Sequence, residues 1–149
     1  MQAIAFRAAA MRFALPTTQV LQVLPDCVTR PLAMAPPAVT GLIRYGRALI
    51  PVVDLGLLLG KTAAAMRRST RLLVVRINTP KPLVFALRAE EVLDLIDIGA
   101  KTGGVPQPRH RWLGDHILDD AETPQLIRAE ELLPDELRAL YVADAGNEP

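Results

Sequence analysis

The stretch from Gly41 to Leu55 reads GLIRYGRALIPVVDL and decides the fold class. Two apolar runs flank a Tyr45-Gly46-Arg47 turn, and the second run contains Pro51 and Asp54. Apolar runs on either side of a glycine-containing turn predict a β-hairpin. No reactive side chain stands at the centre of the stretch. We therefore expect an exposed hairpin tip that belongs to a binding surface rather than to a catalytic one.

The composition indicates one well-packed unit. The chain has 149 residues, of which 50% are hydrophobic and 4% aromatic, so aliphatic side chains must fill the core. Its 13 prolines and nine glycines favour many short strands over a few long helices. The formal net charge of +1 supplies no basic field for nucleic acid or for an acidic membrane surface.

The cysteine content and the hydropathy pattern indicate the compartment. Cys27 is the one cysteine, so it has no internal disulfide partner, and a reducing compartment suits the chain. The longest apolar stretch, from Ala48 to Leu59, is interrupted by Pro51 and Asp54 and is too short to span a bilayer. No basic leader followed by an apolar block opens the chain. We expect a soluble, cytoplasmic protein without direct membrane insertion.

Short elements are predicted on both sides of the hairpin. Alternating and helical apolar spacings give the assignments. On the N-terminal side these are a hairpin from 3–7 and 11–15, a helix of one or two turns over 17–24 and a strand over 28–32. On the C-terminal side they are a helical turn over 55–59, a hairpin from 71–77 and 83–87, a strand over 91–98, a hairpin from 112–118 and 125–127, and an amphipathic helix over 129–142 with Leu132, Leu133, Leu137, Leu140 and Tyr141 on one face.

This order of elements is typical of an all-β fold. About nine or ten short strands with little helix fit small sandwiches or barrels. Long helical crossovers are missing, which disfavours a parallel α/β fold. The basic stretch from Lys61 to Ser69 separates two halves of similar rhythm, and two similar barrels fit that rhythm.

The hairpin stretch resembles the CheW family, the coupling proteins of bacterial chemosensory arrays. The family pattern reads roughly G-V-x-N-L-R-G-x-x-x-P-V-V-D-L. Its positions are occupied without a gap by Gly41, Leu42, Ile43, Pro51, Val52, Val53, Asp54 and Leu55. The stretch 86–92 resembles G-L-x-V-D-x-V and the stretch 126–133 resembles L-L-D-x-x-x-L-L, so the resemblance extends over Met1 to about Val142. The same domain occurs at the regulatory end of the CheA kinase.

The resemblance implies two small five-stranded β-barrels packed side by side in one CheW-like domain over 1–149, with a C-terminal helix. Sub-barrel one takes about 10–68, and sub-barrel two takes about 1–9 plus 69–142. Residues 143–149 are expected to form a frayed tail.

The resemblance also implies a non-enzymatic adaptor. Its implied partners are the regulatory domain of a CheA-type histidine kinase, the cytoplasmic tip of a methyl-accepting chemoreceptor and other CheW-like proteins, which associate it with membrane receptor arrays. A helical receptor tip requires clustered aliphatic side chains with a polar rim. The candidates for this receptor groove are Val20, Val23, Leu24, Ile43, Val92 and Leu95. For each of them packing in the core is the alternative.

The chain departs from the family at the hairpin turn. Where the family has Asn-Leu-Arg-Gly, this chain has Arg44-Tyr45-Gly46-Arg47, and Gln22 stands where the family often has Glu. The joint loss of an acidic and a basic partner is coherent, because removing one alone strands the other. These five residues are candidates for partner specificity. Either Arg44 or Arg47 bonds Gln22, or both arginines are solvated. Glu90 and Arg128 also replace family aspartates, which fits an adaptor of a non-flagellar array for surface motility or second-messenger control.

Enzymatic and nucleic-acid functions are weakly supported. His110 and His116 lack metal-ligand spacing, and no phosphate-binding loop or nucleophile elbow occurs. We expect no catalytic residue, no metal and no cofactor. The alternative from another class is a small-barrel module that binds single-stranded nucleic acid or a small ligand. Nucleic-acid binding requires aromatic platforms and a basic groove, neither of which this composition favours.

Overall fold

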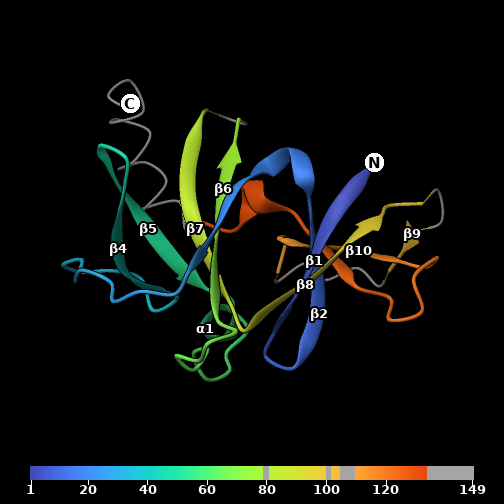
Figure 1. The fold of residues 1–149 in the computed structure, drawn as a ribbon, viewed down its shortest axis with the longest axis horizontal. Helices are drawn as coiled ribbons and strands as arrows, with labels where there is room; N and C mark the ends of the chain where they lie inside the picture. The colour runs from blue at the N-terminus through green and yellow to red at the C-terminus, as the bar shows by residue number, and fades with distance from the viewer. Residues whose placement is uncertain (79–80, 100–101, 105–109, 134–149) are drawn as a thin grey trace.

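Two β-sheets contain nearly all of the regular structure. The computed structural model describes residues 1–78, 81–99, 102–104 and 110–133 (Figure 1). In this part of the chain, one sheet has six strands in the order β8-β1-β2-β11-β10-β9, and the other has five in the order β3-β6-β7-β5-β4. The expected all-β fold with short helices is confirmed, and each sheet takes the place of one expected barrel.

The six-stranded sheet combines strands from both ends of the described chain. Its members are β1 (Gln2–Ala8), β2 (Met11–Pro16), β8 (Glu91–Asp97), β9 (Thr102–Gly103), β10 (Leu113–Ile117) and β11 (Gln125–Ile127). β2 and β11 pair in parallel, and the other pairs of this sheet are antiparallel. The two-residue strand β9 makes this sheet one strand larger than expected.

The five-stranded sheet curls on itself. Its members are β3 (Val20–Pro25), β4 (Val39–Tyr45), β5 (Ala48–Asp54), β6 (Arg71–Ile77) and β7 (Leu83–Ala89). β3 and β4 are its two edge strands. Arg30, which follows β3, forms a two-way backbone bridge with Leu42 of β4, with N···O distances of 2.7 and 2.8 Å. This bridge brings the chain beyond one edge against the opposite edge.

The central strands β6 and β7 are buried on both faces. In β7, Val84 and Ala86 point to one side, while Phe85 and Leu87 point to the other, as strand alternation requires. One side forms the inner core of the curled sheet. The inner core consists of Ile43, Ile50, Val52, Leu72, Val74, Val84 and Ala86. Burial on both faces explains why β6 and β7 are continuous apolar runs rather than alternating ones.

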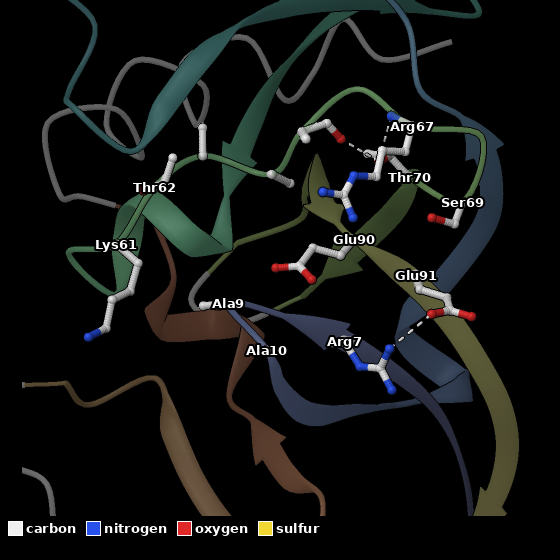
Figure 2. A pocket seen from close by; sticks show the side chains of 13 residues that line it. Arg7, Ala9, Ala10, Lys61, Thr62, Arg67, Ser69, Thr70, Glu90 and Glu91 are labelled. Carbon is white, nitrogen blue, oxygen red and sulfur yellow. Dashed lines mark hydrogen bonds and ion pairs between the residues drawn. The ribbon is translucent and has the colours of Figure 1, made fainter.

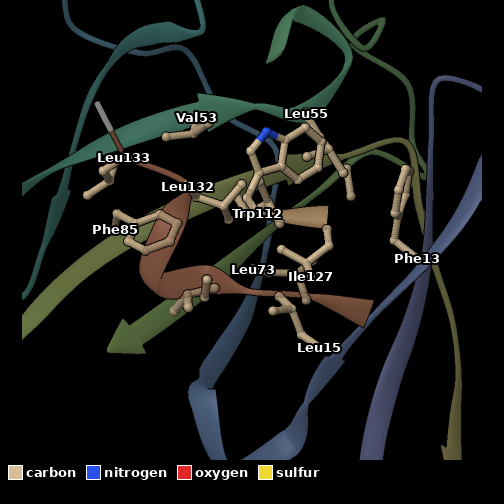
Figure 3. Packing of buried hydrophobic residues seen from close by; sticks show 14 of the residues in the cluster. Phe13, Leu15, Val53, Leu55, Leu73, Phe85, Trp112, Ile127, Leu132 and Leu133 are labelled. Carbon is tan, nitrogen blue, oxygen red and sulfur yellow. The ribbon is translucent and has the colours of Figure 1, made fainter. Parts of the chain in front are cut away.

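The other face of β7 contributes to a larger central core between the two sheets. Phe6 and Phe13 of the six-stranded sheet lie in it, with their ring centroids 6.1 Å apart, and Phe85 enters from β7. Figure 3 shows Trp112 pointing into this core beside Leu55. Because both sheets bury side chains in the same core, we expect them to unfold together.

Several predicted elements are confirmed. The opening hairpin is β1–β2, the motif hairpin is β4–β5, and further hairpins are β6–β7 and β10–β11. The helical turn is α1 (Leu55–Leu58). The Asp54 carboxylate caps α1, because Oδ1 accepts a hydrogen bond from the Leu57 amide at 3.1 Å.

The helix predicted over 17–24 and the strand predicted over 28–32 are wrong. Only η1 (Thr17–Gln19) is helical, and Val20 begins β3. The backbone amides and carbonyls of β3 form hydrogen bonds with β6. A single isolated helical turn is less favourable, because nucleating a helix fixes several residues for few hydrogen bonds. In 28–32 the only ladder contact is the bridge at Arg30, next to Pro31, which has no amide to donate.

Of the predicted helix over 129–142, the structure describes the short helix η2 (Ala129–Glu131), followed by Leu132 and Leu133, which pack in the central core. Leu137, Leu140, Tyr141 and the expected tail over 143–149 lie outside the described residues. In the described ranges no helix has the length and apolar character needed to cross a membrane.

Sheet membership does not follow the expected division at residue 68. β2 lies in the six-stranded sheet with β1, and both β6 and β7 lie in the five-stranded sheet. Hairpin neighbours stay together, because a short turn places the second strand beside the first.

Candidate functional site

Two edge strands keep large apolar side chains exposed. β3 is one edge of the five-stranded sheet, and β8 is one edge of the six-stranded sheet. On β3, Leu21 is 47% exposed and Val23 is 39% exposed, while on β8 Leu95 is 62% exposed. We call these three side chains with their strands the edge-strand surface. Figure 1 shows both strands near the middle of the molecule, between β4 on one side and β9 on the other.

The strand registers relate the direction of β3 to the direction of β8, because each end of β3 lies near the opposite end of β8. At one end, Ala3 pairs with both Pro16 and Ile96, so the end of β8 lies near the segment that leads into β3. At the other end, Arg71 pairs with Pro25 and with Ala89, two residues before β8 begins. The two edges therefore run in opposite directions along the junction of the sheets.

The candidate groove residues fall into three situations. Val23 of β3 and Leu95 of β8 are exposed on the edge-strand surface. Val20, Leu24 and Val92 are half-buried and pack against the cores. Ile43 is buried in the inner core, so its side chain is not available to a partner. Leu21 was missed, because the helical spacing assumed for this segment drew attention to other positions.

The divergent turn has a defined backbone geometry. Tyr45 pairs with Ala48, which leaves Gly46 and Arg47 as a two-residue turn. Gly46 has φ +60°, a conformation that favours glycine. Arg44 Nε donates to the Gly46 carbonyl at 3.3 Å.

Gln22 is exposed on β3, opposite Val74 of β6. Among the described residues, no hydrogen bond joins it to Arg44 or Arg47. The two arginines are exposed, as the alternative of solvated turn residues expects.

A buried ion network closes one end of the inner core. Arg88 forms a fork-to-fork pair with Asp26, with Nε–Oδ1 at 3.1 Å and Nη2–Oδ2 at 2.8 Å. Its Nη1 donates to Asp54 Oδ2 at 3.0 Å and to the Ala64 carbonyl. The side chains of Arg88, Asp26 and Asp54 are 11%, 4% and 0% exposed. Asp54 Oδ2 also accepts from the Ala64 amide at 3.1 Å.

The charges of this network stabilise one another. The hydrogen bond to Asp26 raises the pKa of Arg88 above its usual value against the opposing effect of burial, and Asp54 raises it further. Arg88 therefore stays charged at neutral pH. The resemblance assigned Asp54 to the motif but overlooked Arg88. The sequence pattern that could have identified Arg88 is a charged residue that continues an alternating series of apolar residues. Arg88 follows Val84 and Ala86 on one strand face, and Asp54 follows Ile50 and Val52 in the same way.

A hollow of about 450 Å³ lies beside the ion network, between the 61–70 loop and the β1–β2 turn. Figure 2 shows Arg7 paired with Glu91 on one wall and Arg67 with Thr70 on another. The Arg7–Glu91 pair spans 3.2 Å. The Thr70 hydroxyl donates to the Ala65 carbonyl at 2.6 Å and accepts from the Arg67 amide at 3.2 Å, so it serves the loop. This lining has mixed charge and contains neither histidine nor cysteine.

The histidines do not form a metal site in the described part of the chain. His116 lies on β10 and lines a second hollow with Arg12 and Glu122, which pair at 3.6 Å. His110 packs edge-on against Trp112, with ring centroids 6.1 Å apart. No group of three or more potential metal ligands occurs among the described residues.

Comparison with known proteins decides the family. A model of the CheW-like domain matches residues 2–136 of this chain. The chain belongs to the CheW-like domain family. The resemblance of the hairpin stretch is thereby confirmed, and the two sheets correspond to the two barrel-like units of a CheW fold.

Solved structures agree with the fold. The scaffolding protein TtCheW from Thermoanaerobacter tengcongensis is similar to this chain, with a TM-score of 0.74 and 20% sequence identity. The similarity covers 85% of this chain and 88% of the TtCheW chain. A search of curated protein sequences finds no significant match.

Proposed function

We propose that this CheW-like protein is a non-enzymatic adaptor that couples chemoreceptors of the methyl-accepting type to a CheA-type histidine kinase. The observation that carries the proposal is the exposure of aliphatic side chains on both edge strands of a CheW-like domain. Exposed aliphatic side chains on two sheet edges suit a protein partner better than a small polar ligand.

The edge-strand surface is the proposed receptor contact. Leu21, Val23 and Leu95 supply apolar anchors, and Asp94 and Gln22 supply polar neighbours. A helix of a receptor tip presents apolar side chains at intervals of three and four residues, which fits apolar side chains spread over two strand edges. The scaffolding function of TtCheW supports this proposal by similarity of fold.

The Tyr45-Gly46-Arg47 tip is the proposed site of partner choice. It lies at the tip of the β4–β5 hairpin, and in the strand order β4 and β3 are the two opposite edges of the sheet. The exposed Arg47 and Arg44 offer guanidinium groups for a carboxylate of the kinase regulatory domain or of another CheW-like protein.

Coupling in this proposal is positional. An adaptor transmits a receptor state only by binding the two states of its partners with different free energies. The mechanism needs no reacting group on the adaptor, which accords with the mixed-charge hollows described above.

The test is a calorimetric titration of the full chain with a receptor-tip fragment and, separately, with the kinase regulatory domain. We expect binding of both, and we expect Leu95→Ser to weaken receptor binding about tenfold, as loss of an interface anchor does. The matched control is Leu118→Ser, because Leu118 is similarly exposed but follows β10. Binding of neither partner by the folded protein, or equal effects of both variants, would contradict the proposal.

A further inference from the structure

The edge-strand surface is shared between two sheets, so its shape depends on what holds the two edges relative to each other. β8 forms backbone pairs with β1, and β3 forms backbone pairs with β6. Those ladders fix each strand within its own sheet. The relation between the edges comes from the central core that the two sheets share and from contacts at the ends of the two strands.

Side-chain hydrogen bonds hold the beginning of β3. Thr17 Oγ1 donates to the Gln2 carbonyl at 3.2 Å, and Gln19 Nε2 donates to Glu130 Oε1 at 2.6 Å. Both contacts tie η1, which precedes β3, to the part of the molecule that contains β1 and η2.

The end of β3 is held by Arg88. Asp26 follows the last residue of β3, and its carboxylate receives both arms of the guanidinium fork. Arg88 lies on β7, three residues before β8 begins at Glu91. Between them, the Glu90 amide donates to the Arg7 carbonyl at 2.8 Å and fixes the turn into β8. A short chain of contacts therefore runs from the end of β3 through Arg88 to the start of β8.

We propose that Arg88 is a positioning residue for the receptor-binding surface, whose guanidinium sets where the end of β3 lies relative to the start of β8. The inference rests on the proposed receptor contact and adds the residue that shapes it. A bidentate pair fixes both distance and orientation, whereas a single ammonium donor fixes neither. The pair is nearly inaccessible to water, so solvent does not compete for its hydrogen bonds.

Stability alone does not account for this network. Well-packed apolar residues often replace a buried ion pair without loss of stability. The G-L-x-V-D-x-V pattern also leaves the position of Arg88 unspecified, so the motif by itself does not supply this arginine. Arg88 additionally holds the Ala64 carbonyl, which orders the 61–70 loop at the same end of the molecule.

The decisive variants are Arg88→Lys, which keeps the charge but removes the fork, and the triple variant Arg88→Met with Asp26→Leu and Asp54→Asn, which removes all three charges of the network together. The triple variant leaves no buried carboxylate without its cation, so it serves as the second test where Arg88→Lys is too unstable to assay. Each is titrated with the receptor-tip fragment and with the kinase regulatory domain. We expect receptor affinity to fall about tenfold in both variants, within the range for residues that act on a site without touching its ligand. Kinase-domain affinity stays within about twofold.

Arg12→Lys is the matched control, because Arg12 also pairs with a carboxylate but lies on β2 beside Glu122. Amide hydrogen exchange supplies a readout that a general loss of stability would not reproduce. We expect faster exchange confined to the end of β3 and the start of β8. Uniformly faster exchange over all strands would instead assign Arg88 a purely structural role and overturn the inference.

The outcomes separate the two proposals. If the unmodified chain does not bind the receptor tip, the proposed function fails and the inference fails with it. If the unmodified chain binds but both Arg88 variants bind equally well, the inference is wrong and the proposed function stands. A parallel loss of receptor and kinase affinity would also overturn the inference.

Discussion

Strands β6 and β8 have similar lengths and apolar content but opposite environments. β6 reads RLLVVRI and has five buried residues of seven, whereas β8 reads EVLDLID and has none. β6 lies between β3 and β7, with the inner core on one face and the central core on the other. β8 has β1 as its neighbour on one side and forms an edge on the other. Position in the sheet order therefore decides whether an aliphatic side chain packs in a core or remains available to a partner.

An exposed apolar edge invites aggregation unless a partner or polar residues protect it. β8 places the exposed Asp94 and Asp97 beside Leu95, and β3 ends at Pro25, which has no amide to donate. These features oppose pairing with another strand while they leave the side chains accessible. The edges are thus better suited to a side-chain contact with a helix than to strand addition.

The largest effect on stability is expected in the central core. Phe85→Ala on β7 removes a fully buried ring from the central core, and we expect the free energy of unfolding to fall by about 3–5 kcal/mol. Urea unfolding followed by circular dichroism measures the change. Because the two sheets share this core, both are expected to unfold in one transition, and two separate transitions would contradict the shared core.

The next largest effect is expected at Gly41 of β4, the opposite edge of the same sheet. Gly41 has φ +150°, and an added Cβ would lie 2.4 Å from the Arg30 carbonyl oxygen. Gly41→Ala must therefore displace the bridge that curls the sheet, with an expected loss of about 1–3 kcal/mol. Gly103→Ala is the control, since its Cβ would meet only a Leu118 methyl at 3.5 Å. Equal melting temperatures for the two variants would show that the bridge contributes nothing.

A smaller effect is expected at the hairpin tip. Gly46→Ala places an L-residue at φ +60°, so we expect a loss of about 1 kcal/mol in the free energy of unfolding. Arg47→Ala, at the neighbouring exposed position, is expected to change stability by less than about 0.5 kcal/mol. Thermal unfolding of both variants checks the difference. The same strain opposes restoring the arginine that the CheW family has at position 46.

The smallest effect on stability is expected at the exposed edge. Leu95→Ser removes a side chain that is mostly in water, so the free energy of unfolding is expected to change by less than about 0.5 kcal/mol. Together with the expected loss of receptor affinity, this result would complete the contrast with Phe85→Ala. A loss of several kcal/mol in urea unfolding would instead assign Leu95 to the core.

Local patterns predicted the hairpins well and the long-range contacts poorly. The β4–β5 hairpin follows from its glycine-containing turn and flanking apolar runs, and the β10–β11 hairpin follows from apolar runs on either side of a polar turn over 119–122. The segment after Thr17 was assigned to a helix because a short apolar run fits both periods, and only its pairing with β6 selects the strand. Of the groove candidates, Val23 and Leu95 are exposed, whereas Ile43 takes the alternative of core packing that the sequence also offered.

The all-β class, most of the hairpins and the CheW-like motif follow from the sequence alone, because turns and strand alternation depend on neighbouring residues. Tertiary structure decided which apolar strands became edges and which became the centre, since sheet order is set by pairing between distant segments. It also brought Asp26, Asp54 and Arg88 together from three separate parts of the chain. A buried charge is tolerated only with its partners in place, and those partners meet only when the curled sheet has formed.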